Sequence, residues 1–245
     1  MVMNGMIFAA GLGTRLAPLT ASMPKALVRV ANRPLLEWAI EHFVAAGVNN
    51  IVVNVHHKAD QVEEFLYKNQ GRWHADIAIS DERAELLDTG GGLIKALSLF
   101  GNDGPIVVGN VDVLSDAPLE ALCIKHKSSG ADATLLTSGR HSTRNLLFDA
   151  EGRLCGWRDV AHDKERMARS VDVAYAEAFN GFHVIEQKLI MGMGPVRPLP
   201  IIGAYLDAAP NFNIMRHNDP TNYYWFDVGT LEKLQNAQAF MENQQ

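Results

Sequence analysis

The stretch from Met6 to Lys25, MIFAAGLGTRLAPLTASMPK, constrains this 245-residue chain most strongly. It opens with a short apolar run that predicts a buried strand over Met6 to Ala10, and then breaks into a glycine-rich loop. Glycines directly after a strand let the backbone approach a ligand, and successive main-chain N–H groups can bind phosphate oxygens. An arginine and a lysine in the same stretch supply positive charge for a polyphosphate. The stretch therefore predicts a phosphate-binding loop.

Two common phosphate-binding motifs do not fit this loop. A P-loop has four residues between its first glycine and a Gly-Lys-Ser/Thr sequence, which is missing here. The dinucleotide-binding fingerprint has a third glycine three residues after the second, and an acidic residue at the end of the next strand. Position 16 is a leucine, and the next predicted strand, Ile51 to Val55, is followed by His56 and His57. The sequence therefore disfavours an NAD-dependent oxidoreductase.

The loop closely resembles the signature of the sugar-1-phosphate nucleotidyltransferases, also called nucleoside-diphosphate-sugar pyrophosphorylases. The positions that match in register are Gly11, Gly13, Thr14, Arg15, Pro18, Leu19, Thr20, Pro24 and Lys25. A second segment, Trp225 to Thr230, closely resembles the Trp-x-Asp-x-Gly-Thr motif of the same family. The resemblance covers essentially the whole chain. A glycine- and proline-rich connection without function is the alternative interpretation, and the number of matching positions disfavours it.

The resemblance implies roles for the residues of the loop. Arg15 would bind the phosphates of the leaving group, and Lys25 would stabilise charge around the reacting phosphate, so both are expected to be catalytic. The residues expected to bind the nucleotide in this loop are Ala10, Gly11, Gly13 and Thr14.

A predicted strand over residues 105–109 ends in Asn110-Val111-Asp112. A carboxylate at the carboxyl end of a parallel strand lies where open α/β sheets bind ligands. The resemblance implies that Asp112 and Asp227 hold a metal ion and that Asn110 contacts the nucleotide. Because Mg²⁺ commonly takes one or two carboxylates together with phosphate oxygens, we expect Mg²⁺ as the cofactor.

Three consecutive glycines, residues 90–92, precede a predicted helix over Leu93 to Leu99. Without Cβ atoms they would let a flat nucleobase lie against the backbone. The resemblance implies that Gly90 and Gly91 make this contact. A flexible helix cap is the alternative interpretation.

After residue 138 the pattern changes. Residues 145–149 and 153–157 predict a hairpin, and the polar residues 158–170 predict a mobile excursion. Many relatives contact the sugar through a Glu-Lys pair, and the aligned place here reads Trp157-Arg158-Asp159. The resemblance implies that Asn180 and Gly181 meet the sugar.

The first half of the chain repeats a β-loop-α rhythm, which predicts a mainly parallel sheet flanked by helices. The resemblance implies one Rossmann-like, GT-A-like nucleotidyltransferase domain over residues 1–245. Residues 1–138 would form its nucleotide-binding half, and residues 139–245 its sugar-binding half with a small β-rich lobe. A last pair of strands over residues 212–216 and 224–230, and a final helix capped by Thr230, complete the prediction. We expect no left-handed β-helix domain.

Composition limits the other possibilities. The chain has 22 Lys and Arg against 28 Asp and Glu, a net charge of −6, so a general affinity for nucleic acid is not expected. Cys123 and Cys155 lack CxxC spacing and are interpreted as ordinary thiols. The first residues lack the features of a signal peptide, and no stretch reaches about 18 apolar residues. We therefore expect a cytoplasmic protein without a membrane span.

The resemblance implies an enzyme that joins a nucleoside triphosphate to a sugar 1-phosphate and releases pyrophosphate. The Thr-Gly-Gly-Gly sequence and the missing Glu-Lys pair are similar to the N-acetylmuramate-1-phosphate uridylyltransferases of cell-wall recycling, so UTP with N-acetylmuramate 1-phosphate is the favoured pair. GTP with mannose 1-phosphate and a CTP-dependent, phosphocholine-type cytidylyltransferase stay open as alternatives. A non-catalytic, nucleotide-sugar-sensing subunit would be expected to lose Arg15, Lys25 or one aspartate, and all are present. The oligomeric state is not predicted.

Overall fold

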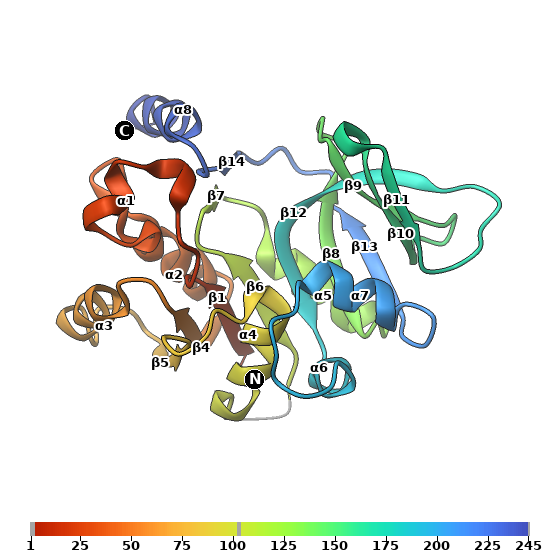
Figure 1. Cartoon of the computed structure of the whole chain (residues 1–245), viewed down its shortest axis with the longest axis horizontal. Helices are drawn as coiled ribbons and strands as arrows, with labels where there is room; N and C mark the ends of the chain where they lie inside the picture. The colour runs from red at the N-terminus through yellow and green to blue at the C-terminus, as the bar shows by residue number, and fades with distance from the viewer. Residues whose placement is uncertain (1–2, 102–103, 245) are drawn as a thin grey trace.

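A mixed β-sheet forms the centre of the molecule (Figure 1). The computed structural model describes residues 3–101 and 104–244. Within these residues the sheet path runs β11-β10-β9-β12-β6-β1-β4-β5, while β8 pairs with β12 and β13 pairs with β8. The strands are β1 Met3–Phe8, β4 Val48–Val55, β5 Asp76–Asp81, β6 Ile106–Asn110, β8 Ala133–Ser138, β9 Arg144–Phe148, β10 Leu154–Asp159, β11 Lys164–Met167, β12 Tyr175–Ile185 and β13 Ile214–Asn218.

Most strands in the central part of this sheet point the same way. Strands β5, β4, β1 and β6 are parallel neighbours, and β13 is parallel to β8. Strand β12 is antiparallel to both β6 and β8, so β8 runs in the same direction as β6. The mainly parallel sheet predicted from the sequence is confirmed. Its parallel strands bring their carboxyl ends to one edge, where ligands of such sheets bind.

Strand β12 connects the central sheet to a β-rich lobe. Its first residues pair with β9, and its last residues pair with β6. The register of β12 against β8 shifts between Phe179 and His183, and Gly181 lies there with a φ of 85°. Extra residues on one strand bend it and increase its twist. The bend directs β9, β10 and β11 away from the central strands, as the right side of Figure 1 shows.

Helices cover both faces of the sheet (Figure 1). They are α1 Leu19–Ser22, α2 Leu35–Ala45, α3 Ala59–Lys68, α4 Asp88–Ala96, α5 Leu119–Ser129, α6 Gln187–Gly192, α7 Ile201–Ala208 and α8 Leu231–Glu242. The 3₁₀ helices are η1 Thr14–Leu16, η2 Lys25–Leu27, η3 Leu97–Leu99 and η4 Val160–His162. Two small sheets pair β2 Arg29–Val30 with β3 Arg33–Pro34, and β7 Val113–Ser115 with β14 Trp225–Asp227. Among the described helices, none has the length and apolarity that a membrane crossing requires.

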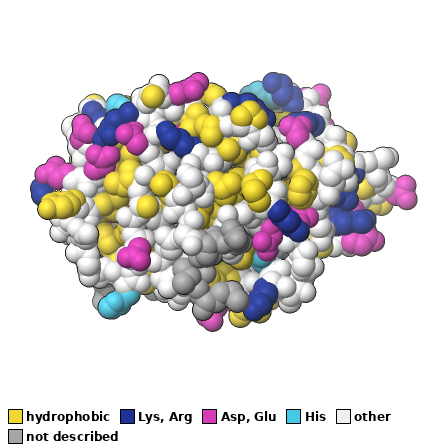
Figure 2. Space-filling view, turned by 90° about the horizontal axis from the view of Figure 1, so that it is seen from below, with side chains coloured by type: hydrophobic (Ala, Val, Ile, Leu, Met, Phe, Trp, Pro, Cys, Tyr) yellow, Lys and Arg dark blue, Asp and Glu magenta, His cyan; other side chains and the backbone are white. Residues whose placement is uncertain are grey.

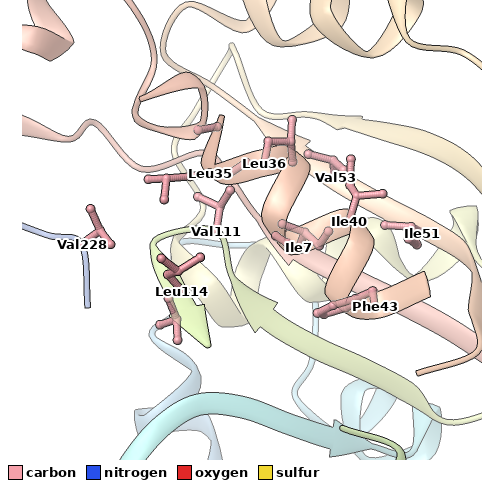
Figure 3. Packing of buried hydrophobic residues seen from close by; sticks show 14 of the residues in the cluster. Ile7, Leu35, Leu36, Ile40, Phe43, Ile51, Val53, Val111, Leu114 and Val228 are labelled. Carbon is pink, nitrogen blue, oxygen red and sulfur yellow. The ribbon is translucent and has the colours of Figure 1, made fainter. Parts of the chain in front are cut away.

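Two clusters of buried hydrophobic side chains pack against the two faces. Ile7 and Val53 point to the face that α2 covers, where Ile40 and Phe43 meet them (Figure 3). The preceding residues of the same strands, including Met6, point to the opposite cluster under α4, α6 and α7. This alternation follows from the two-residue period of a strand. Because each buried Ile, Leu or Phe contributes about 1.5–3 kcal/mol, the sheet is a firm support for the loops at its edge.

The surface seen in Figure 2 carries acidic and basic side chains interspersed with hydrophobic ones. No basic stripe crosses the described residues on this face. Nucleic-acid binding usually requires a basic stripe or patch, so this face gives no support for nucleic-acid binding.

Several predicted elements are confirmed, and others are wrong. The hairpin of β9 and β10 is present, and the Oγ1 of Thr230 accepts the N–H of Lys233 at the start of α8. The first strand, predicted over Met6 to Ala10, ends at Phe8, so Ala9 and Ala10 already belong to the loop. The helix predicted from Leu93 begins at Asp88, so the three glycines are helical residues.

The segment predicted as a mobile excursion, residues 158–170, contains β11, which pairs antiparallel with β10. One prediction for the second half is also wrong. The predicted last strand pair does not form, because β13 pairs with β8 while β14 pairs with β7. This error arises because the partners of β13 and β14 are chosen by contacts with segments that are distant in sequence.

Candidate active site

The phosphate-loop candidate leaves β1 and folds back onto its own side chains. Gly13 has a φ of 66°, and its carbonyl accepts a hydrogen bond from Thr20 Oγ1 over 2.9 Å. A Cβ on Gly13 would lie 2.9 Å from the Thr20 Cγ2 atom and 3.0 Å from the Lys25 Cβ atom. A Cβ on Gly11, in contrast, would meet nothing within 4 Å. Packing thus explains Gly13, whereas the space beside Gly11 is open to a ligand.

Asn54, close to the end of β4, holds the start of this loop. Its Oδ1 accepts the N–H of Ala9 over 2.7 Å and that of Ala10 over 3.3 Å. Its Nδ2 donates to Glu82 Oε1 over 2.8 Å, and Glu82 Oε2 accepts the N–H of Leu87 over 3.2 Å. Burial raises the pKa of the Glu82 carboxyl. The two side chains therefore link the phosphate loop to the loop before α4.

Sequence reasoning missed both Asn54 and Glu82. Asn54 could have been identified from the sequence, because it is a polar residue inside the apolar run of β4. The main-chain N–H of Ala10 already donates a hydrogen bond to Asn54 Oδ1 within the protein. The predicted contact of Ala10 with the nucleotide stays a prediction, as do those of Gly11, Gly13 and Thr14.

Lys25 and Asp112 form an ion pair at the edge of the sheet. The Nζ of Lys25 donates to Asp112 Oδ2, and Lys25 is 9% exposed. Asp112 lies in the short turn between β6 and β7, two residues after Asn110. The pair connects the last residues of the phosphate loop to the end of β6. The predicted catalytic lysine and the predicted metal ligand therefore lie together.

The ladder between β7 and β14 brings Asp227 beside Asp112. Asp227 is paired with Val113, and the N–H of Val228 donates to the carbonyl of Asp112 over 2.7 Å. Lys233, one turn into α8, donates from Nζ to Asp227 Oδ2 over 2.6 Å. Lys233 is a third site residue that sequence reasoning did not select. The two predicted metal ligands therefore converge from strands that are far apart in sequence.

Arg15 lies beside Asp227. A Cβ on Gly229 would be 2.7 Å from Asp227 Oδ1 and 3.0 Å from Arg15 Nη2. The glycine of the Trp-Phe-Asp-Val-Gly-Thr sequence therefore leaves the space in which the guanidinium and the carboxylate approach each other. Arg15, Lys25 and the two aspartates form one cluster.

The donor set of this cluster fits a hard divalent cation. The lysines occupy Oδ2 of Asp112 and Asp227, and neither Oδ1 accepts a hydrogen bond from the described residues. No group of three or more His, Cys, Asp or Glu side chains forms a metal site within residues 3–101 and 104–244. Two carboxylates fit Mg²⁺ if substrate phosphates supply further oxygens, which is its common arrangement in nucleotide sites.

Asn180 lies in the bulge of β12 and is 1% exposed. Its Oδ1 accepts hydrogen bonds from Ser138 Oγ over 3.1 Å and Arg140 Nε over 3.0 Å. Its Nδ2 donates to the Tyr223 hydroxyl over 2.7 Å, and its carbonyl accepts from Trp225 Nε1 over 2.8 Å. Asn180 thus positions these neighbouring side chains, and its own contact with a sugar stays a prediction.

Gly181, which is expected to meet the sugar, lies against Asn110, which is expected to contact the nucleotide. A Cβ there would lie 3.1 Å from Asn110 Nδ2 and 3.0 Å from Val113 Cγ2. The φ of 85° also disfavours other residues. Asn110 and Gly181 are therefore neighbours at the end of β6.

The three glycines of α4 have a packing role. A Cβ on Gly90 would lie 2.7 Å from the carbonyl oxygen of Leu199, and one on Gly91 would lie 2.0 Å from that of Arg197. The N–H groups of Gly90 and Gly91 both donate to the Leu199 carbonyl, over 2.7 and 3.1 Å. A Cβ on Gly92 would lie 2.6 Å from Glu82 Oε1. The predicted contact of Gly90 and Gly91 with a nucleobase stays a prediction, since packing alone accounts for these glycines.

Comparisons with known proteins agree with this architecture. One solved structure is a UDP-glucose pyrophosphorylase complexed with UDP-glucose, with a TM-score of 0.77, 17% identity and 100% of both chains covered. Another is a UTP-bound UGPase from Acinetobacter baumannii, with a TM-score of 0.79 and 18% identity, covering 100% of this chain and 95% of the other. At such low identity these likenesses show the fold, and they confirm the predicted Rossmann-like architecture.

Curated relatives are similar in sequence as well. The N-acetylmuramate alpha-1-phosphate uridylyltransferase of Caulobacter vibrioides is 40% identical over 158 residues, which cover 60% of this chain and 65% of the relative. A mannose-1-phosphate guanyltransferase of Schizosaccharomyces pombe is 36% identical over 229 residues, covering 93% of this chain and 61% of the relative. The chain therefore spans less than two thirds of the length of these relatives. Because residues 4–146 match the family model described as nucleotidyl transferase, the chain belongs to the nucleotidyl transferase family.

Proposed function

We propose that this protein transfers a nucleotidyl group from a nucleoside triphosphate to a sugar 1-phosphate and releases pyrophosphate. One observation carries the proposal: Arg15 and Lys25 from the phosphate loop, Asp112 after β6 and Asp227 in β14 meet at the carboxyl edge of the parallel strands. A site with three cationic side chains, two carboxylates and an open glycine in the same loop as Arg15 suits the binding of a triphosphate. Family membership supports the same reaction class.

The chemistry of the transfer matches what these residues supply. An oxygen of the sugar phosphate forms a bond to the α-phosphorus, the bond from that phosphorus to the bridging oxygen breaks, and pyrophosphate leaves with the electron pair. Since the nucleophile is already an anion, the site needs no general base and must mainly neutralise charge and hold the groups in line. Asp112 and Asp227 would hold Mg²⁺, which would offset phosphate charge when bound. Arg15 would bind the leaving phosphates, and Lys25 would stabilise the α-phosphate or the incoming sugar phosphate.

UTP with N-acetylmuramate 1-phosphate is the substrate pair that we propose first. The Caulobacter relative named for this reaction supports it. So does the sequence Trp157-Arg158-Asp159, which stands where many relatives have a Glu-Lys pair; its Asp159 is buried and accepts hydrogen bonds from Arg144 and His162. This reaction would place the protein in cytoplasmic nucleotide-sugar biosynthesis for the cell wall.

GTP with mannose 1-phosphate is the second candidate. The similarity to the guanyltransferase of Schizosaccharomyces pombe extends over 93% of this chain, further than that to the Caulobacter relative. If main-chain groups contact the nucleobase, the side chains of the sequence do not identify that base. The nucleotide and the sugar must therefore be tested directly.

The deciding experiment measures pyrophosphate release with Mg²⁺, crossing UTP, GTP, CTP and dTTP with a panel of sugar 1-phosphates and phosphocholine. Release that requires one pair of substrates supports the proposed reaction and names both. Binding of a nucleotide without release across the whole panel would contradict the proposed transfer and favour a sensing subunit. Release with phosphocholine alone would instead favour the cytidylyltransferase.

A further inference from the structure

Arg140 has no part in the reaction as proposed, yet it lies at the same edge of the sheet. It follows β8 by two residues. Its Nε donates to Asn180 Oδ1 over 3.0 Å and its Nη2 donates to the carbonyl of Phe179 over 2.8 Å. Its guanidinium carbon lies 3.9 Å from the centroid of the Trp225 ring. These contacts fix both the position and the plane of the cation.

The charge of Arg140 has no carboxylate in direct contact. Within the described residues, no carboxylate forms an ion pair with it, and the carboxylate that acts on it from a distance is Asp227. Burial lowers the pKa of the Arg140 guanidinium, and Asp227 and, to a smaller extent, Tyr223 oppose that change. However, Asp227 is already paired with Lys233 and would hold a metal ion in the proposed function. A partly buried cation whose acidic neighbour is neutralised favours an anionic ligand.

Arg140 also lines a pocket of about 570 Å³ between the β-rich lobe and α7. Two more arginines line it, and each has its own partner: Arg144 pairs with Asp159 and Arg166 pairs with Asp207. The apolar part of the lining comes from Leu146, Trp157, Phe179, Pro200, Ile202 and Leu206. The volume is in the range of small-molecule sites, and the lining suits a group that combines apolar surface with one negative charge.

We propose that Arg140 binds a carboxylate carried by the sugar, so that the enzyme selects sugar 1-phosphates with an acidic side group over neutral ones. This inference rests on the proposed function and specifies its substrate class. A planar guanidinium can hold a carboxylate through two parallel hydrogen bonds, and here Trp225 and Asn180 hold that plane in advance. N-acetylmuramate fits this chemistry, because it carries a lactate ether whose carboxylate N-acetylglucosamine lacks.

Equilibrium binding tests the proposal without requiring turnover. Calorimetry would compare N-acetylmuramate 1-phosphate with N-acetylglucosamine 1-phosphate in the presence of Mg²⁺ and an α,β-methylene triphosphate, once with the uridine and once with the guanosine analogue. We expect the acidic sugar to bind the wild-type protein about 10- to 100-fold more tightly, which is the usual contribution of a hydrogen-bonded charge. Arg140→Gln should remove this preference while keeping the affinity for the neutral sugar. Arg140→Lys, which keeps the charge without the planar fork, should give an intermediate preference.

Arg153→Gln is the matched control. Arg153 is in the same lobe, pairs with Asp149 and Glu151, and does not line the pocket, so its loss changes the net charge equally. An equal preference in wild type and Arg140→Gln, or tighter binding of the neutral sugar by wild type, would overturn the inference. Selective binding without pyrophosphate release would contradict the proposed function alone, whereas release without selectivity would contradict the inference alone.

Discussion

Asn54 Nδ2 donates a hydrogen bond to Glu82 Oε1 over 2.8 Å, and both side chains are buried beneath the phosphate loop. Through its Oδ1, the same amide holds the N–H groups of Ala9 and Ala10. Through Leu87, Glu82 holds the segment that leads into α4. One buried pair therefore fixes the two loops on either side of the proposed triphosphate site.

Asn54→Ala should destabilise the protein by about 2–4 kcal/mol, because it leaves two main-chain donors and Glu82 without their partner in a buried place. Urea unfolding followed by circular dichroism measures this. Asn69→Ala is the control, since Asn69 donates to the Phe65 carbonyl at the exposed end of α3 and should cost under about 1 kcal/mol. If Asn54→Ala costs no more than Asn69→Ala, the pair is not a structural link.

Gly91→Ala should be strongly destabilising although alanine favours helices. Its Cβ would lie 2.0 Å from the Arg197 carbonyl oxygen, so α4 or the segment beside it must move, at a cost of about 3 kcal/mol. Gly203→Ala in α7 is the matched control, because a Cβ on Gly203 would meet nothing within 4 Å. It should be neutral or stabilise by up to about 1 kcal/mol. The midpoint temperatures of thermal unfolding should therefore shift in opposite directions for the two variants, or by very different amounts. Equal shifts would argue against the packing role of Gly91.

Asp112→Asn and Asp227→Asn should each lower turnover by about 100-fold or more, since each removes charge that would hold Mg²⁺ against the reacting phosphates. A chelator should abolish pyrophosphate release by the wild-type protein, and added Mg²⁺ should restore it. Glu120→Gln, an acidic residue on the exposed part of α5, should have wild-type turnover. Turnover of the Asp112 variant within about threefold of wild type, with folding verified, would remove Asp112 from the proposed site.

His183→Phe should make the protein less sensitive to acid. His183 is buried between the rings of Phe179 and Tyr205, and neither ring nitrogen has a hydrogen-bond partner in the described chain. Burial lowers its pKa from 6.5 to about 3. Between these values the unfolded chain binds a proton that the folded chain does not, so the free energy of unfolding falls as the pH falls through this window.

The same linkage gives the expected difference in unfolding free energy between wild type and His183→Phe. Going from pH 7 to pH 5, wild type should lose about 2 kcal/mol more of its unfolding free energy than His183→Phe. Urea unfolding at both pH values measures this difference, and other titrating groups cancel because both proteins contain them. Parallel losses in the two proteins would mean that His183 is protonated in the folded state.

Local sequence predicted the parts of this protein whose physics is local. The cap of the final helix was predicted at Thr230, and α8 begins at Leu231 with Thr230 Oγ1 accepting the N–H of Lys233, because this hydrogen bond joins residues that are close in sequence. The motif residues Arg15, Lys25, Asp112 and Asp227 were selected because the short segments that contain them resemble motifs of the nucleotidyltransferase family, and such motifs are local in sequence. The mainly parallel sheet follows from the β-loop-α rhythm, since parallel neighbours need a crossover connection.

Only the tertiary structure decided how distant segments meet. Nothing near Tyr175–Ile185 in the sequence indicates that β12 enters the sheet between β6 and β8, because strand pairing is chosen by non-local contacts. For the same reason the partners of Asn54 and Arg140, a carboxylate 28 residues away and an amide 40 residues away, leave no local pattern. The sequence by itself selected the charged residues Arg15, Lys25, Asp112 and Asp227, and the fold decided which groups touch them, because hydrogen bonds and packing depend on distance in space and not along the chain.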